Sequence, residues 1–230
     1  MKICGLQKLT LLDYPEKVAC TVFTGGCNFR CPFCHNASLV TSLRDENSIT
    51  EEELFLFLEK RAGLLDGVCV TGGEPLIHTD LAQFLRKIKG LGYAVKLDTN
   101  GYFPEQLREL VSQGLIDYVA MDVKSDAAHY AKTAGLATID YGKIEENIRF
   151  LLTGSVEYEF RTTVVIGLHD TDILRNTAQS VAGAKRYFLQ KFVDSGDLVG
   201  SGMSAFSDDE MRSFLAAVSP YVKSAAVRGL

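Results

Sequence analysis

The sequence lacks both a long apolar run and an excess of basic residues. Nowhere do about 18 apolar residues follow one another, so we expect no transmembrane helix. The formal charge of -5 gives no broad basic surface, and we therefore expect neither a nucleic acid nor a membrane as partner. Near the N-terminus, Lys2, Lys8 and Asp13 interrupt the apolar residues that a signal peptide would need. We expect a cytoplasmic protein.

Internal repeats, low-complexity tracts and linker-like segments are missing as well. The chain has 230 residues, of which 47% are hydrophobic, and this is enough apolar material for a sizeable core. We therefore predict one domain that covers residues 1–230.

Short β-rich runs alternate along the chain with longer helical patterns. The six predicted strands are Val18–Thr24, Gly67–Thr71, Ala94–Asp98, Tyr118–Asp122, Glu157–Val165 and Tyr187–Phe192. The first predicted helix begins at Thr50. The other predicted helices cover Thr79–Lys89, Pro104–Gln113, Tyr141–Leu152, Thr171–Lys185 and Asp208–Val218. Such alternation is typical of parallel strands joined by crossover helices, so we predict an α/β fold. Periodicity alone leaves open whether the sheet is a partial barrel or a doubly wound sheet.

The chemically distinctive motifs follow or end predicted strands. Besides the clustered cysteines, they are Gly72–Pro75, Asp98–Gly101 and Asp122–Lys124. In both candidate folds the functional residues gather at the carboxyl ends of the strands. The positions of these motifs therefore predict a site at that edge of the sheet.

Three of the six cysteines lie within eight residues, at Cys27, Cys31 and Cys34. This spacing would arise by chance with a probability of about 0.004. Three thiolates favour a soft metal centre, whereas structural zinc and an ordinary electron-transfer [4Fe–4S] cluster each take four protein ligands. The missing fourth cysteine favours an iron–sulfur cluster with one iron open to a small ligand.

Two other interpretations of the cysteines are weaker. His35 could complete a zinc site, but no second ligand pair follows at the spacing of a zinc finger. A disulfide framework would usually be spread more evenly along the chain. We interpret the scattered cysteines as small buried hydrophobic residues. These are Cys4, Cys20 and Cys69.

The cysteine spacing, with the aromatic Phe33 directly before Cys34, resembles the CxxxCxxC signature of the radical S-adenosylmethionine superfamily. The resemblance implies a partial (β/α)6 barrel and a [4Fe–4S] cluster on Cys27, Cys31 and Cys34. It also implies that S-adenosylmethionine chelates the open iron and that Phe33 packs near the adenine. Reductive cleavage of the cofactor would give methionine and a 5′-deoxyadenosyl radical that abstracts a hydrogen atom, as in an oxidoreductase.

Gly72-Gly73-Glu74-Pro75 matches the GGEP motif of this superfamily, which holds the ammonium group of the methionine. Paired glycines let a backbone approach a ligand closely. Taken alone, the same residues could form an ordinary turn between a strand and a helix.

Three further elements resemble glycyl-radical-enzyme activating proteins. The resemblance places Asp98 and Thr99 near the methionine carboxylate, where they help bind a monovalent cation, although the segment could simply be a turn. It places Asp122 and Lys124 beside the cofactor or an incoming peptide; the alternative is a solvated pair at a strand end. Arg161 could pair with a carboxylate of the ligand or form a structural ion pair.

Other segments carry weaker signals. Lys191-Phe192-Val193 falls where pyruvate formate-lyase activating enzymes carry Pro-Tyr-His, and it departs from that pattern. The remaining histidines have no spacing that suggests a triad or a metal site, so we expect structural or surface roles for them. They are His78, His129 and His169.

Resemblance extends over nearly the whole chain. Gly5–Lys8, Leu12–Pro15 and Cys31–Asn36 look most like anaerobic ribonucleoside-triphosphate reductase activating proteins. The span from Asn36 to Gly67 has no cysteine and hence no ferredoxin insertion. This resemblance implies an activase that removes a hydrogen from a glycine of a partner enzyme and needs a reductant such as flavodoxin.

Three alternatives to this activity remain at the level of sequence. The partner could be pyruvate formate-lyase or a related glycyl radical enzyme. The substrate could be a small molecule, as for 7-carboxy-7-deazaguanine synthase. The chain could also be a non-catalytic metal or electron-transfer module.

Overall fold

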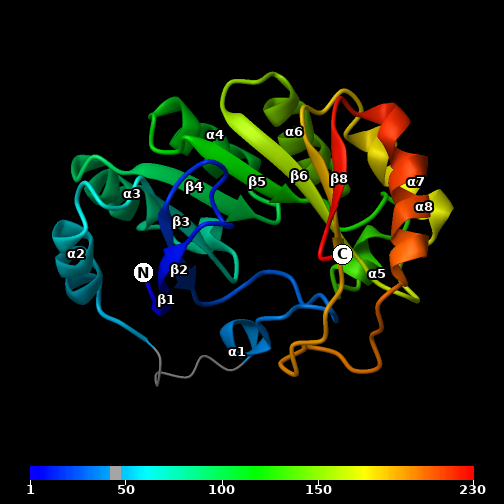
Figure 1. Cartoon of the computed structure of the whole chain (residues 1–230), viewed down its shortest axis with the longest axis horizontal. Coiled ribbons are helices and arrows are strands. Elements are labelled where there is room, and N and C mark those ends of the chain that lie inside the picture. Colours follow the sequence, from blue (N-terminus) through cyan, green and yellow to red (C-terminus); the bar gives the residue numbers. More distant parts are fainter. Residues whose placement is uncertain (42–47) are drawn as a thin grey trace. The chain divides into compact units, whose positions relative to one another are not determined.

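A computed structural model describes residues 1–41 and 48–230 (Figure 1). Its eight strands form one sheet in which they are hydrogen-bonded in chain order, with β1 and β8 at the two edges. The strands are β1 (Ile3–Thr10), β2 (Ala19–Thr24), β3 (Gly67–Gly72), β4 (Ala94–Thr99), β5 (Tyr118–Asp122), β6 (Glu157–Val164), β7 (Tyr187–Lys191) and β8 (Ala225–Arg228). This unclosed sheet confirms the predicted α/β class and the choice of a partial barrel.

Helices connect most of these strands. The longer ones are α2 (Glu51–Lys60), α3 (Leu81–Gly90), α4 (Pro104–Ser112), α6 (Tyr141–Leu152), α7 (Thr171–Ser180) and α8 (Asp208–Val218). The short ones are α1 (Ala37–Val40), α5 (Tyr130–Thr133) and the 3-10 helices η1 (Pro75–Ile77) and η2 (Ser219–Tyr221). In the part of the chain that the structure describes, no helix is long and apolar enough to cross a membrane.

Contacts between Cα atoms divide the chain into two compact units. The N-terminal unit comprises Met1–Asn28, Ser38–Thr99 and Glu105–Val119. The C-terminal unit comprises Phe29–Ala37, Asn100–Pro104 and Ala120–Leu230. The chain thus passes between the units inside the cysteine segment, directly after Asn28. A single domain over residues 1–230 stays a prediction.

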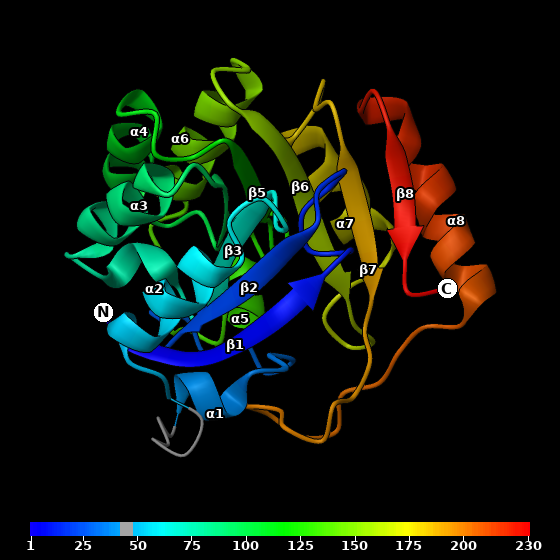
Figure 2. The same ribbon diagram turned by 60° about the vertical axis from the view of Figure 1, so that its left-hand side comes forward.

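The N-terminal unit is built on β1 to β4. Strand β1 pairs antiparallel with β2, as Figure 2 shows, whereas β2, β3 and β4 are parallel to one another. Helix α2 begins with a capping box in which Thr50 and Glu53 exchange hydrogen bonds. The Tyr93 hydroxyl donates a hydrogen bond of 2.6 Å to the Leu58 carbonyl and so joins the end of α2 to the start of β4.

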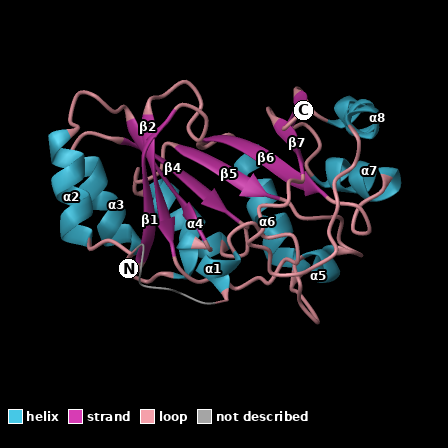
Figure 3. Ribbon diagram, turned by 60° about the horizontal axis from the view of Figure 1, so that its bottom comes forward, coloured by secondary structure: helices cyan, strands magenta, loops and turns pink. Residues whose placement is uncertain are grey.

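The C-terminal unit is built on β6, β7 and β8, which are parallel. Helices α7 and α8 pack side by side (Figure 3). Helix α8 also contacts β8. The core contains the buried Tyr158, Phe160 and Tyr187, and the Tyr187 hydroxyl lies 2.8 Å from that of Thr162. The large aromatic rings fill this unit while their hydroxyl groups find partners, as buried tyrosines require.

All six predicted strands are present, and their bounds agree within one residue at each end. The predicted helix Thr171–Lys185 is too long, because α7 ends at Ser180 and Gly183 follows with a φ of 81°, a left-handed conformation that stops a helix. The two edge strands β1 and β8 were not predicted. Strand β8 has four residues, two of them alanine, so it carries almost no strand signal.

Arg228 fastens the edge strand β8 to β6 across β7. Its guanidinium makes two hydrogen bonds, of 2.7 and 2.9 Å, to the carboxylate of Glu159, which is 1% exposed. On the way it lies 3.5 Å from the centre of the Phe188 ring. A planar guanidinium suits this combination of a bidentate pair and a ring contact.

We predict that Arg228→Gln lowers the free energy of unfolding by about 2 kcal/mol, measured with urea. Removing one partner of a fully buried ion pair costs about 3–5 kcal/mol, and Arg228 is partly exposed. The matched control is Arg175→Gln, which breaks the exposed pair with Asp172 and should change stability by less than about 0.5 kcal/mol. Equal effects of the two variants would show that Arg228 does not hold the sheet edge.

Candidate functional site

In the N-terminal unit, the turn after β3 lies against the segment that leads to Cys27. The Gly73 amide donates to the Thr24 carbonyl at 2.9 Å, and the Glu74 amide donates to the Gly26 carbonyl at 2.8 Å. A Cβ atom on Gly73 would stand only 1.8 Å from the Gly26 oxygen. The glycines of Gly72–Pro75 are therefore needed for the backbone of this turn to reach the cysteine segment.

The carboxylate of Glu74 ties this turn to the end of β4. It is fully buried, and its Oε1 accepts hydrogen bonds from the Leu76 amide at 3.1 Å and from the Thr99 hydroxyl at 2.8 Å. Glu74 thereby caps η1 and fixes the position of Thr99. Two residues predicted for the site from separate motifs are in direct contact.

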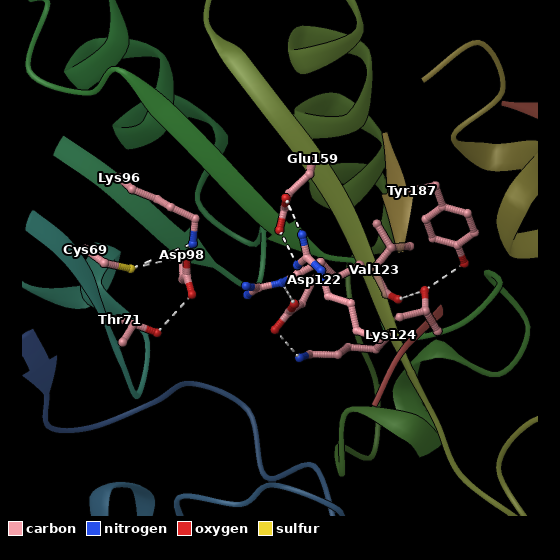
Figure 4. A network of polar contacts seen from close by, with 12 residues as sticks. Cys69, Thr71, Lys96, Asp98, Asp122, Val123, Lys124, Glu159 and Tyr187 are labelled. Atoms are coloured by element: carbon pink, nitrogen blue, oxygen red, sulfur yellow. Dashed lines mark hydrogen bonds and ion pairs between the residues drawn. The ribbon is translucent and has the colours of Figure 1, made fainter. Parts of the chain in front are cut away.

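Asp98 precedes Thr99 and belongs to a second polar cluster (Figure 4). Its carboxylate contacts the ammonium group of Lys96 and accepts a hydrogen bond from the Thr71 hydroxyl at 3.3 Å. Lys96 is not among the residues predicted for the site. Its spacing of two residues from Asp98 on a strand, which places both side chains on one face, was the available signal.

In the C-terminal unit, the second half of the cysteine segment is held by backbone hydrogen bonds. The Cys34 amide donates to the Cys31 carbonyl at 3.0 Å, which forms a tight turn with a cysteine at each end. The Arg30 amide donates to Ala134 at 2.9 Å, and the Gly200 amide donates to the Pro32 carbonyl at 2.8 Å. These bonds fix the backbone on both sides of Cys31.

The Asp122–Lys124 motif lies at the end of β5. The Asp122 carboxylate accepts hydrogen bonds from Lys124 Nζ at 2.9 Å and from Arg161 Nε at 2.8 Å. Lys124 Nζ also stands 5.9 Å from the centre of the buried Phe33 ring. Residues from three separate predictions, namely the Asp122–Lys124 motif, Arg161 and Phe33, are thus neighbours, and Figure 4 shows Lys124 reaching back to Asp122.

Charge pairing decides the ionisation of this group. Burial by itself would raise the pKa of Asp122, but the charges and hydrogen bonds of Arg161 and Lys124 outweigh burial and hold the pKa well below its usual range. Burial would lower the pKa of Lys124, and Asp122, helped by Cys31, raises it well above the usual value instead. Both side chains are charged at neutral pH.

His35 and Phe192 stack with ring centres 5.5 Å apart. Burial, together with the charge of Lys124, lowers the pKa of His35. The segment Lys191–Val193 therefore contacts the cysteine segment through Phe192.

Of the other histidines, His78 lies 3.0 Å from the Gly25 carbonyl oxygen and His129 lies 2.7 Å from Asp126. These contacts suit the structural roles predicted for them.

The six cysteines all lie in described parts of the chain, and none forms a disulfide. Cys31 is buried, Cys27 and Cys34 are partly exposed, and the scattered cysteines are buried as predicted. Within residues 1–41 and 48–230, no group of three or more His, Cys, Asp or Glu side chains is already arranged to hold a metal ion. The chemistry of the donor set, three thiols on one short segment, fits an iron–sulfur cluster.

The family model and two relatives point to the same family. The model of the radical SAM superfamily matches residues 21–178. A Methanocaldococcus jannaschii protein with the provisional name glycyl-radical enzyme activating enzyme MJ1227 is 31% identical over 98% of this chain and 95% of its own length. A second protein of that organism, provisionally named in the same way, is 26% identical over 77% of this chain and 68% of its own length.

Among solved structures, a domain of pyruvate-formate lyase-activating enzyme from Bacteroides vulgatus has a similar fold. The TM-score is 0.58 at 20% identity, and the match covers 71% of this chain and 99% of that domain. At this level of identity the likeness concerns the fold.

Gly135 generates a prediction about how the cysteine segment is held. Its φ is 69°, and a Cβ atom there would stand 1.9 Å from the Arg30 carbonyl oxygen. We predict that Gly135→Ala lowers the free energy of unfolding by about 2 kcal/mol more than Gly154→Ala, as overpacking does, and lowers the iron bound after reconstitution.

Gly154 is the matched control, because its φ of 76° is similar but no atom lies within 4 Å of the position that a Cβ atom would take. The backbone strain is therefore common to both variants, and only the collision differs. Urea unfolding and iron analysis of the two proteins check the prediction, and equal losses would contradict it.

Proposed function

The chain belongs to the radical SAM superfamily, and from this premise we propose that it activates a glycyl radical enzyme by removing a hydrogen atom from one of its glycines. Membership implies a radical SAM oxidoreductase that uses S-adenosylmethionine and a [4Fe–4S] cluster. The observation that carries the proposal is the 31% identity, over 98% of this chain, to the protein provisionally named glycyl-radical enzyme activating enzyme MJ1227.

We assign the cluster to Cys27, Cys31 and Cys34. The backbone turn from Cys31 to Cys34 supports this assignment, as does the absence of disulfides among the six described cysteines. When bound, cluster and S-adenosylmethionine together supply a 5′-deoxyadenosyl radical after one-electron reduction. His35 stacks on Phe192, which weakens the alternative in which its ring completes a zinc site.

The other candidate residues have roles in binding and orientation. We assign Gly72, Gly73 and Glu74 to the methionine ammonium, supported by the partly exposed glycines of a turn whose shape Glu74 fixes. We assign Asp98 and Thr99 to the methionine end of the cofactor and Phe33 to the adenine.

Asp122, Lys124 and Arg161 form the charged group that we assign to the cofactor or the substrate peptide. The two cations share one carboxylate. Within the trio of Asp122, Lys124 and Arg161, two positive charges stand beside one negative charge. Two neighbouring cations attract an anionic ligand such as a carboxylate.

The proposed substrate is a loop of anaerobic ribonucleotide reductase, and the proposed reductant is flavodoxin or a similar one-electron donor. The support is the likeness of Gly5–Lys8, Leu12–Pro15 and Cys31–Asn36 to activating proteins of that reductase. Pyruvate formate-lyase is the second candidate partner, and the Bacteroides vulgatus domain that shares this fold is named after the activation of that enzyme.

The test combines the reconstituted protein, dithionite, S-adenosylmethionine and the candidate reductase under anaerobic conditions. We predict a glycyl radical doublet in the electron paramagnetic resonance spectrum. Cys31→Ala should bind less iron and give no doublet, because three thiolates are the only protein ligands proposed for the cluster. Cys20→Ala removes a buried thiol outside the segment and should keep both iron and doublet.

The outcomes separate the alternatives. Cofactor cleavage without a doublet would contradict this partner, and replacing the reductase by pyruvate formate-lyase would then test the second candidate. Cleavage coupled only to a small molecule would support an enzyme that resembles 7-carboxy-7-deazaguanine synthase. Zinc in place of iron, or no cleavage, would support the non-catalytic module.

A further inference from the structure

The polar cluster between β3 and β4 contains a buried cation that the roles above do not use. Cys69 and Lys96 are direct register partners on these parallel strands. Thr71 and Asp98 lie two residues further along each strand, so all four side chains share one face. Figure 4 shows these side chains converging on Asp98.

Lys96 is the centre of this cluster. Its side chain is 2% exposed, and its ammonium group contacts Asp98 Oδ1 and lies 3.7 Å from Cys69 Sγ. A buried ammonium is stable only when an anion compensates it, and Asp98 is the anion in contact with it. The side chain reaches along β4 from the deeper Lys96 position toward the strand end.

Both oxygens of Asp98 accept hydrogens from the chain itself. Oδ1 carries the Lys96 ammonium, with Cys69 Sγ 3.8 Å away, and Oδ2 carries the Thr71 hydroxyl at 3.3 Å. This arrangement differs from what a monovalent metal ion needs. Such an ion binds several oxygen lone pairs, whereas here the neighbouring groups offer hydrogens and a soft sulfur atom.

We propose that the Lys96 ammonium is the built-in counter-cation of Asp98, so that the site does not take the monovalent metal ion which the resemblance implied. A metal ion on the same carboxylate would stand next to an ammonium group of like charge. Lys96 is a positioning residue, because it acts on the cofactor only by holding the Asp98 carboxylate charged and in place.

The inference rests on the proposed function only where cofactor binding is measured. A purely structural ion pair would also stabilise the fold, and an added ammonium could restore that stability, but its loss would leave the Kd of S-adenosylmethionine unchanged. Restoration of cofactor binding together with stability by an added ammonium is therefore the decisive readout.

The experiment uses the reconstituted protein in choline, sodium, potassium or methylammonium chloride at equal ionic strength. Thermal unfolding and the Kd of S-adenosylmethionine are measured for the wild type, Lys96→Ala and the control Lys87→Ala. Lys87 is exposed and pairs with Glu51 on the surface of the same unit. All three proteins are compared in every salt.

For the wild type and Lys87→Ala we expect the same midpoint and the same Kd in all four salts. For Lys96→Ala in choline we expect about tenfold weaker binding, the scale of a lost hydrogen bond to a charged group. Methylammonium fits the space left by the side chain and should restore most of the binding and raise the midpoint.

Two results would overturn the proposal. One is a wild type that needs sodium or potassium for stability or binding. The other is a Lys96→Ala protein that is weakened equally in every salt. If Lys96→Ala does not fold, the double variant Lys96→Ala with Asp98→Asn removes both charges; it should fold, and failure of that variant as well would also count against a charge-pairing role.

The unfolding readout keeps this inference separate from the proposed function. A protein that binds no S-adenosylmethionine would contradict the proposed function, yet the salt response of its unfolding would still show whether an added ammonium replaces Lys96.

Discussion

The cysteine segment is held by backbone contacts that only glycine allows. On the N-terminal side, Gly73 lies so close to the Gly26 carbonyl that a single methyl group would collide with it. On the C-terminal side, Gly135 approaches the Arg30 carbonyl in the same way, and Gly200 packs on Pro32. Each contact is accompanied by a backbone hydrogen bond of the same segment. These contacts fix the path of the backbone through the segment. The positions of the thiols depend on that path.

Paired charges at strand ends are the second recurring device. Asp98 is paired with Lys96 in the N-terminal unit, and Asp122 is paired with Lys124 and Arg161 in the C-terminal unit. Each carboxylate is held by donors from neighbouring strands or from its own strand. A buried carboxylate without such partners would carry a large desolvation penalty, which would destabilise the fold. The two groups differ in composition, since Asp98 is paired with one cation and Asp122 contacts two.

Most residues of the candidate site could be predicted from the sequence, because they belong to short, distinctive motifs at the ends of predicted strands. The strand pattern placed Glu74, Asp98 and Asp122 at one edge of the sheet, and the structure puts each within two residues of the end of its strand. Lys96 was missed because a lysine within a strand usually indicates an exposed position. Its burial becomes visible only in the structure, where β4 pairs with β3 and Lys96 lies beside Cys69.

Other features depend on parts of the chain that lie far apart in sequence. The contact of Gly135 with Arg30 joins residues more than a hundred positions apart, and no local pattern at either residue announces it. The stack of Phe192 on His35 is of the same kind. The edge strand β8 is another case, because Arg228 finds Glu159 only after β7 lies between them. Such contacts are set by tertiary packing rather than by propensity.

The central claim is that three cysteines hold an iron–sulfur cluster whose open iron binds S-adenosylmethionine. The most direct measurement is the electron paramagnetic resonance spectrum of the reduced cluster before and after S-adenosylmethionine is added, on protein of known iron content. We predict about four irons per chain and a change in the cluster spectrum on addition of the cofactor. A cluster spectrum that stays the same at saturating cofactor, or a protein that binds zinc rather than iron, would contradict it.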